Sequence, residues 1–234
     1  MKVLDILPLD RYDFEAVLIP AIISIILMVG ASWQLIDYIS LDKSVDTSST
    51  VLAISTIAII GVWYQVVRIA GKKIVETAMF GGKLQFLPTT RYLMYSDEFG
   101  DSLLADKVRN KIEKDFGIEL KSKAQEKKNQ KAAAEIIVSA VKLIKKKVQT
   151  SNNEMYLRKN IRYGLFRNTT GGCLLAVLAE IVFAIVSIVN STSFTLGWAI
   201  MAVTVIIMII TYRCAKDTAA EYANELFETY INIA

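Results

Sequence analysis

A single acidic residue lies inside a long apolar run in the C-terminal third of the chain. Glu180 follows Gly172 by eight residues, which places it about 12 Å along a helix. An ionisable side chain at that depth in a membrane is costly, so it must face a protein interior, a partner group or water. Glu180 is therefore the first residue whose chemistry needs a structural explanation.

The residues that share a helix face with Glu180 are small or polar. They recur at spacings of three, four, four, three and four residues, which places them on one helical stripe. Such a stripe either lets two helices approach closely or lines a narrow aqueous path in which carboxylates favour cations. The stripe consists of Cys173, Ala176, Glu180, Ala184, Ser187 and Ser191.

Two interpretations of Glu180 are open at this point. Either it controls permeation as part of a pore or gate, or it forms a buried pair with Arg68, which lies about 6 Å inside Lys72 on another apolar run. Both interpretations hold, in different states of the protein, if the Glu180–Arg68 pair breaks when the pore opens. The candidate pore or gate residues are Glu180, Cys173, Ala176, Ala184, Ser187 and Arg68.

A second candidate for chemistry is a lysine-rich segment near the middle of the chain. Nine lysines from Lys121 to Lys147 stand against two acids, Glu126 and Glu135, a net charge of +7. Close lysines bind polyanions because each neutralised phosphate releases counterions. They equally suit a solvated helix face or anionic lipid headgroups. The candidate anion-binding residues are Lys121, Lys123, Lys127, Lys128, Lys131, Lys145, Lys146 and Lys147.

The composition argues against an enzyme. Histidine is absent, which excludes imidazole bases, imidazole metal ligands and every Ser-His or Cys-His triad. Cys173 and Cys214 lie in or beside apolar runs, so no disulfide framework is predicted. The sequence therefore predicts no catalytic residue, no metal site and no cofactor.

Four apolar runs must position these residues. With 53% hydrophobic residues and a mean hydropathy of +0.40, the chain of 234 residues is too apolar for a soluble protein. Each run approaches the roughly 20 helical residues that cross a hydrocarbon core. Short joins at 40–50 and 191–194 predict two antiparallel helical hairpins. The runs are 17–39, 51–71, 171–190 and 195–212.

The predicted fold is an all-α membrane protein with a helical cytoplasmic insert between the second and third spans. The insert contains about one hundred residues, enough for a small domain. The domains expected are a cytoplasmic N-terminal segment, a transmembrane hairpin, a mainly helical cytoplasmic domain, a second transmembrane hairpin and a cytoplasmic C-terminal helix. Their ranges are 1–16, 17–71, 72–170, 171–212 and 213–234.

Periodicity and capping residues predict the helices of the insert. The second span continues as a helix to about Phe80, where two glycines end it, and a capping box at Ser122 and Gln125 opens one long helix. Gly117 closes a separate helix with an apolar stripe. The expected helices cover 102–116, 122–148, about 154–166 and, after the fourth span, 217–231.

Paired motifs around the insert resemble a bacterial family of four-span membrane proteins, over about 80–172. Members typically read GGxPTT and later NxxYGFxRN. This chain inserts 84–87 before its PTT and has Leu165 where Phe is usual. The matching residues are Gly81-Gly82-Lys83, Pro88-Thr89-Thr90 with Leu93, Asn160, Tyr163-Gly164 and Arg167-Asn168.

The matched residues also suit a scaffold. Pro88 fixes a turn, and Thr89 or Thr90 is suited to cap the following helix. Tyr163-Gly164 permits close packing, and Arg167-Asn168 can bond the ends of neighbouring helices.

The resemblance implies a function that composition alone does not. Some members look like the membrane effectors encoded beside nucleotidyltransferases in bacterial anti-phage operons, such as the channel subunit of the Hailong system. It therefore implies an ion channel effector of antiviral defence, whose ligand is an anionic nucleotide or short oligonucleotide made by a nucleotidyltransferase encoded nearby.

Four spans supply too few helices for a broad pore, so conduction predicts a homo-oligomer, such as a tetramer, with the pore on its symmetry axis. The alternative is a non-conducting membrane sensor or anchor that recruits a soluble defence partner. Glu180 separates the two, because a channel needs the stripe in water and an anchor needs it paired.

The distribution of basic residues predicts that both termini and the insert are cytoplasmic, in a bacterial inner membrane. The two hairpin joins carry one basic residue, Lys43, whereas ten flank the spans on the other side. We expect a reporter that is active only in the cytoplasm to give signal when fused after Ala234. A reporter active only in the periplasm, fused at the same residue, is the control, and its activity would overturn the topology.

Overall fold

The computed structural model describes residues 10–38, 49–96 and 101–233. Over these ranges the chain forms helices, and no strand occurs among them. The predicted all-α class is thus confirmed for the part of the chain that the structure describes. Contacts divide the chain into two compact units, which we call unit 1 (Met1–Val75 and Gly164–Ala215) and unit 2 (Glu76–Tyr163 and Lys216–Ala234).

Among the described residues, three helices are long and apolar enough to cross a membrane, which suggests that the protein is membrane-associated. They are Arg11–Trp33, Glu154–Val189 and Thr195–Asn232. They contain most of the first predicted run, all of the third except Asn190, and all of the fourth. The second run is helical over Ser49–Ile69, but the side chains of 49–58 lie outside the described residues, and its span stays a prediction.

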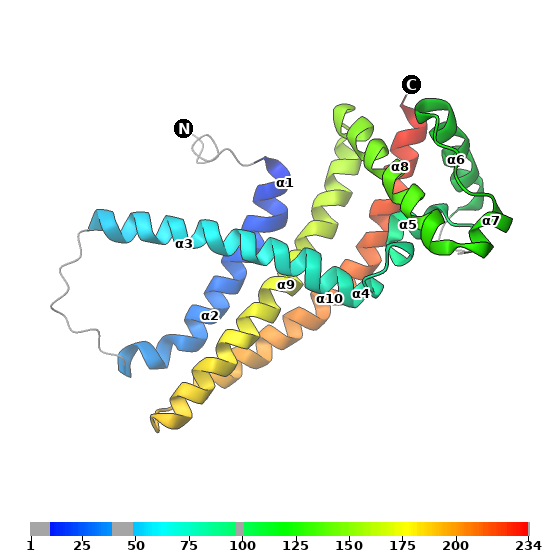
Figure 1. Cartoon of the computed structure of the whole chain (residues 1–234). Coiled ribbons are helices and arrows are strands. Elements are labelled where there is room, and N and C mark those ends of the chain that lie inside the picture. The colour runs from blue at the N-terminus through cyan, green and yellow to red at the C-terminus, as the bar shows by residue number, and fades with distance from the viewer. Residues whose placement is uncertain (1–9, 39–48, 97–100, 234) are drawn as a thin grey trace. The chain divides into compact units, whose positions relative to one another are not determined.

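Unit 1 contains a first and a second helical rod and a helical hairpin (Figure 1). Each of the two rods contains a π-helical turn, which is frequent at functional or strained positions. The hairpin is that of α9 and α10, of which unit 1 takes Gly164–Ala215. The elements are α1 (Arg11–Asp13), η2 (Phe14–Leu18), α2 (Ile19–Tyr38), α3 (Ser49–Ile69), η3 (Ala70–Val75), α9 (Glu154–Val189) and α10 (Thr195–Asn232).

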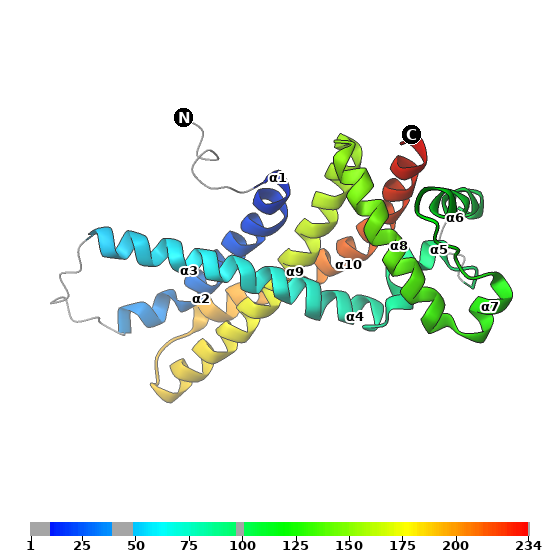
Figure 2. The same ribbon diagram turned by 45° about the horizontal axis from the view of Figure 1, so that its top comes forward.

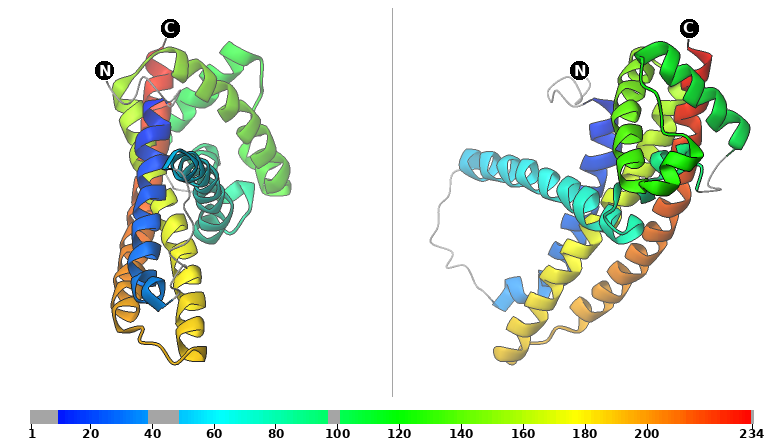
Figure 3. Two further views of the ribbon diagram at one scale, coloured as in Figure 1. Left: turned by 90° about the vertical axis from the view of Figure 1, so that its left-hand side faces the viewer. Right: turned by 45° about the vertical axis from the view of Figure 1, so that its right-hand side comes forward.

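The helix α2 runs beside the unit 1 parts of α9 and α10 (Figure 3). Small residues allow this packing: Ala31 of α2 and Ala184 of α9 are buried in one cluster with Phe194. Outward-facing side chains are large and apolar, as Ile26 and Ile188 show with exposed fractions of 64% and 70%. The exposed surface of these helices is therefore suited to lipid.

The helix α3 crosses α2 steeply instead of running beside it (Figures 1 and 3). The antiparallel hairpin expected from the short join stays a prediction, and two polar contacts link α3 to the first rod. Trp63 Nε1 donates a hydrogen bond to Ser24 Oγ at 2.8 Å. Arg68 forms an ion pair with Asp13 at 3.3 Å.

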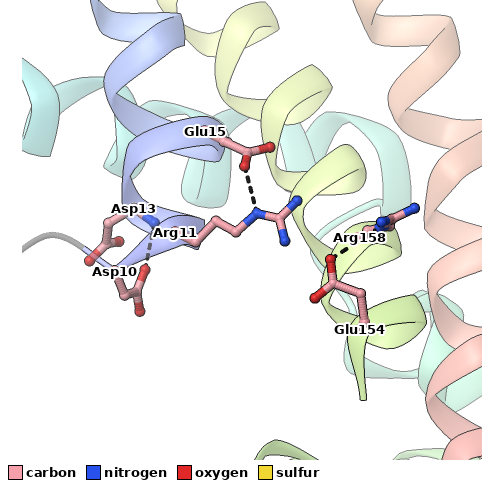
Figure 4. A network of polar contacts seen from close by, with 6 residues as sticks. All are labelled: Asp10, Arg11, Asp13, Glu15, Glu154 and Arg158. Carbon is pink, nitrogen blue, oxygen red and sulfur yellow. Dashed lines mark hydrogen bonds and ion pairs between the residues drawn. The ribbon is translucent and has the colours of Figure 1, made fainter. Parts of the chain in front are cut away.

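Local polar contacts define the start of the first rod and of α9 (Figure 4). Asp10 Oδ1 accepts a hydrogen bond from the Asp13 backbone N–H at 2.7 Å, and Arg11 pairs with Glu15 one turn later. On α9, Glu154 pairs with Arg158 at 3.2 Å. These pairs are exposed and one helical turn apart, so each adds only a few tenths of a kcal/mol.

Unit 2 gathers short helices around the C-terminal part of α10 (Figures 1 and 2). Its core is aromatic: Tyr92 packs on Phe227 at 4.9 Å between ring centroids, and Tyr163 stacks on Tyr222 at 5.8 Å. Besides parts of α9 and α10, its elements are α4 (Glu76–Phe80), η4 (Leu84–Phe86), α5 (Pro88–Leu93), α6 (Ser102–Phe116), α7 (Lys123–Lys128) and α8 (Gln130–Thr150).

The helix ends of unit 2 confirm some capping predictions. The helix α6 has the expected bounds and ends at Gly117, whose φ of 63° suits glycine. The Ser122 capping box is present. The single long helix predicted from it is wrong, because Asn129 leaves the helical conformation and its side chain starts α8 by accepting from the Ala132 N–H at 3.0 Å.

Two further expectations are corrected. The short helices predicted at 154–166 and 217–231 are not separate elements, since α9 and α10 run through both positions without a break. Thr89 and Thr90 do not cap α5, because both lie inside it after Pro88 at its first turn. The buried Thr90 hydroxyl has no hydrogen-bond partner in the described part of the chain.

One short stretch of α9 contacts both π-helical turns of unit 1. Asn168 Nδ2 donates to the carbonyl oxygen of Ala16, in η2, at 2.6 Å. A methyl group on Gly171 would lie only 2.6 Å from the backbone nitrogen of Gly71, in η3. A methyl group on Gly164 would lie 2.9 Å from the Cβ atom of Ala16, which is also in η2. We call Gly164–Gly171 the α9 contact stretch.

The contact stretch predicts a stability difference between two glycine substitutions. We expect Gly171→Ala to destabilise the protein by about 1–3 kcal/mol, because the added methyl group would press on the Gly71 backbone. Gly61→Ala is the matched control, since no atom lies within 4 Å of a methyl group there. Thermal unfolding in detergent, followed by circular dichroism, measures both. Equal melting temperatures would contradict the close backbone contact.

Candidate functional site

Glu180 is fully buried within unit 1, on the α9 face that packs against α10. Its Oε1 atom is 2.9 Å from the Thr204 hydroxyl of α10. Its Oε2 atom has no hydrogen-bond partner among the described residues. A buried carboxyl oxygen without a partner is unusual, because such groups normally find a donor or an ordered water. Glu180 is therefore the most unusual polar group of unit 1.

The pair of Glu180 with Arg68, one of the two interpretations that the sequence leaves open, is not formed in this structure. Arg68 binds Asp13 instead, while the hydroxyl of Thr204 is the group at Glu180. Neither 19–36 of α2 nor 195–211 of α10 contains an ionisable residue. The carboxyl group thus lacks a counter-charge from either of these helices.

The small-residue stripe around Glu180 is a packing surface within the single chain. The hydroxyl of Ser187 donates to the carbonyl oxygen of Thr192 at 2.7 Å and so stabilises the turn between α9 and α10. Ser191, at the end of the stripe, is exposed in that turn. In this arrangement the other stripe residues do not line an open aqueous path. They are all buried: Cys173, Ala176, Glu180, Ala184 and Ser187.

The hydroxyl groups of α10 that face this stripe were not predicted from the sequence. Thr204 and Thr211 are both buried, seven residues apart and so on one helix face. Thr170 of α9 donates to the Thr211 hydroxyl at 2.9 Å. The heptad spacing of threonines in an otherwise apolar run was the signal available in the sequence.

The predicted lysine surface is divided by the structure of unit 2. Lys147 binds Asp115 at 3.0 Å, and this hydrogen bond holds the pKa of Asp115 below its ordinary value. Lys145 lies over the Tyr222 ring at 5.4 Å. Lys121 is only partly exposed. Of the candidate lysines, five are exposed: Lys123, Lys127, Lys128, Lys131 and the later Lys146. We call the first four the α7–α8 lysine group.

Two buried charged residues hold the segment that carries the α7–α8 lysine group. Glu126, 1% exposed, accepts hydrogen bonds from the backbone N–H groups of Tyr95 and Ser96 at 3.0 and 2.7 Å. Arg109 donates to the carbonyl oxygens of Leu93 and Lys121. Nothing in the local sequence distinguishes these residues from their exposed neighbours.

The remaining motif residues have structural contacts. The Tyr163 hydroxyl donates to Glu76 at 2.8 Å within unit 2. Among the residues described, no group of acids and cysteines is arranged to hold a metal ion. No family matches the sequence, and no curated protein or solved structure is significantly similar to it.

Glu126 provides a test of how the lysine segment is held. Glu126→Gln should destabilise the protein by about 1–3 kcal/mol, because an amide accepts through only one of the two oxygens that now bind backbone N–H groups. Glu135→Gln, at an exposed position of α8, should have no measurable effect. Thermal unfolding of both variants measures the difference. An unchanged melting temperature in Glu126→Gln would show that the hydrogen bonds of Glu126 to the backbone do not stabilise the lysine segment.

Proposed function

We propose that the protein is an oligomeric ion channel of a bacterial inner membrane that acts as an anti-phage defence effector. Its gate responds to an anionic nucleotide or short oligonucleotide that binds unit 2. The defence role and the neighbouring nucleotidyltransferase rest on the resemblance of the GGK…PTT and NxxYG…RN motifs. The channel itself rests on unit 1.

The observation that supports this function best is that α9 and α10 belong to both units. Each helix runs without interruption, α9 from Glu154 to Val189 and α10 from Thr195 to Asn232. A ligand that changes the packing of unit 2 therefore acts on the same two helices that carry Glu180 and Thr204. Conduction changes only if the ligand binds one gating state more tightly than the other.

The burial of Glu180 suits a non-conducting arrangement. Ions cross a membrane protein along hydrated groups, and Glu180 is fully excluded from solvent here. Opening would separate α9 from its neighbours enough to wet the stripe. One chain has too few spans to enclose a pore, so a homo-oligomer such as a tetramer would place the pore on its symmetry axis.

The α7–α8 lysine group is the proposed ligand site. Lys123, Lys127, Lys128 and Lys131 are exposed over nine residues of sequence. This spacing offers phosphate contacts along one segment, while Lys145 and Lys147 have contacts inside unit 2. The ligand is then held by charge at its backbone and not by recognition of its bases.

The second candidate function, a non-conducting sensor or anchor that recruits a soluble partner, is favoured by one observation. The stripe residues are buried within one chain, as expected when a small-residue face only packs helices. In that case ligand binding would change what unit 2 recruits, and no ion would cross the bilayer.

A charge-neutralised variant tests the channel and its ligand site together. In this variant Lys123, Lys127, Lys128 and Lys131 are changed to Gln. We expect it to bind a short oligonucleotide at least tenfold more weakly, because fewer counterions are released on binding when fewer lysines contact phosphates. Its affinity should also fall less steeply when salt is raised. Ion flux from liposomes should respond to the oligonucleotide in the parent protein and not in this variant.

The matched control changes Lys142 to Gln, an exposed lysine away from the α7–α8 lysine group. It should bind and conduct as the parent does. Equal binding by the four-lysine variant and the parent would place the ligand elsewhere. Binding without any ion flux from either protein would favour the sensor or anchor.

A further inference from the structure

We propose that Glu180 is a proton-binding switch: it is a neutral carboxylic acid that ties α9 to α10 in this arrangement, and release of its proton separates the two helices. The protonation rests on the geometry of unit 1 alone. Its effect on conduction deepens, and rests on, the proposed channel function.

The hydrogen bonds at Thr204 indicate where the proton lies. The Thr204 hydroxyl has one proton and two acceptors within reach, the Ile200 carbonyl oxygen at 3.0 Å and Glu180 Oε1 at 2.9 Å. Threonine hydroxyls within helices commonly donate to the carbonyl four residues earlier. If Thr204 donates to Ile200, the contact with Glu180 is a hydrogen bond only when Glu180 supplies the proton.

The surroundings of Glu180 favour the same assignment. As an ion, Glu180 would be completely buried, with no donor at Oε2 from the part of the chain that the structure describes. Burying a charge without a partner is far less favourable than burying the neutral acid. As an acid it donates from Oε1 to Thr204, and only the carbonyl-type oxygen Oε2 remains without a partner.

The neighbouring elements offer no charge that would stabilise the ion. On α9 itself, the titratable group on the same small-residue stripe is the buried thiol of Cys173, seven residues before Glu180. The packed segments of α2 and α10, 19–36 and 195–211, contain no ionisable residue. On the described part of α3, Arg68 is paired with Asp13. An ionised Glu180 is therefore satisfied only if water enters the bundle.

The switch then has two states. In the state described here the O–H of Glu180 bonds Thr204 across the α9–α10 contact. When the O–H bond breaks, the proton passes to water and the carboxylate draws water between the helices, because no group in this bundle replaces hydration. Since one proton is released, the equilibrium shifts by at most about tenfold per pH unit.

Infrared spectroscopy of the full-length protein in liposomes tests the protonation. At pH 7 exposed carboxyl groups are ionised, so a protonated-carboxyl band at this pH reports a buried acid. We expect the band in the parent protein, its complete loss in Glu180→Gln, and its retention in Glu119→Gln, a control at an exposed acid. A band that is equal in parent and Glu180→Gln, or absent from the parent, would overturn the proposal.

Substitutions of Thr204 keep the proposal testable if Glu180→Gln does not accumulate. Thr204→Val removes the acceptor, so the Glu180 band should shift to higher frequency, and Thr204→Ser should restore the parent position. Thr211→Val removes a buried hydroxyl of the same helix and should leave the band unchanged. An unshifted band in Thr204→Val would show that Glu180 does not donate a hydrogen bond to Thr204.

Ion flux measured against pH separates the switch from the channel. If both proposals hold, parent flux should rise by up to about tenfold per pH unit toward alkaline pH, the limit for one proton, and Glu180→Gln flux should not depend on pH. Parent flux that is independent of pH would overturn the switch. A protonated-carboxyl band without flux in any variant would instead overturn the channel and leave the protonated site supported.

Discussion

The arrangement of unit 1 depends on one close backbone contact, between Gly171 of α9 and Gly71 of η3. A side chain at either position would overlap the opposite segment, so the two segments approach only because both residues are glycine. Asn168, beside this contact, bonds the Ala16 carbonyl in the other π-helical turn. One stretch of α9 therefore contacts both rods, and further along α9 the stripe residue Ala184 packs against Ala31 of α2.

Under the proposed switch, unit 1 responds to proton release because the Glu180 carboxyl group is buried in a bundle that excludes water. Glu180 is completely buried, and among the described residues its hydrogen-bond partner is the Thr204 hydroxyl. In such a site the neutral acid is more stable than the carboxylate ion unless water enters the bundle. The same burial that excludes an open path in this arrangement therefore gives the carboxyl group a way to promote opening.

Unit 2 uses its charges in two different ways. Arg109, Glu126 and Lys147 bind groups within the unit and fix the positions of its short helices. The α7–α8 lysine group has no such role in the described contacts and faces solvent. A net charge counted over the whole segment combines these two sets, although only the exposed set is suited to an external anion.

Several features were determined by the sequence alone. Apolar runs of sufficient length predict membrane-crossing helices at 17–39, 171–190 and 195–212, because hydrocarbon accepts backbone only when its hydrogen bonds are internal. Gly117, Ser122 and Gln125 predict local helix ends, since capping depends on neighbours in the chain. Glu180 was recognisable as unusual because an acid in an apolar run is costly wherever it points.

Other features were decided only by the tertiary structure. The partner of Arg68 is Asp13 and not Glu180, because the packing of the helices decides which acid lies within reach of the guanidinium group. Thr204 meets Glu180 because α9 and α10 pack in one particular register. Lys145 and Lys147 differ from Lys146 because α8 turns one face toward Tyr222 and Asp115. Pairing, burial and register depend on residues distant in the chain, and periodicity within one helix does not contain that information.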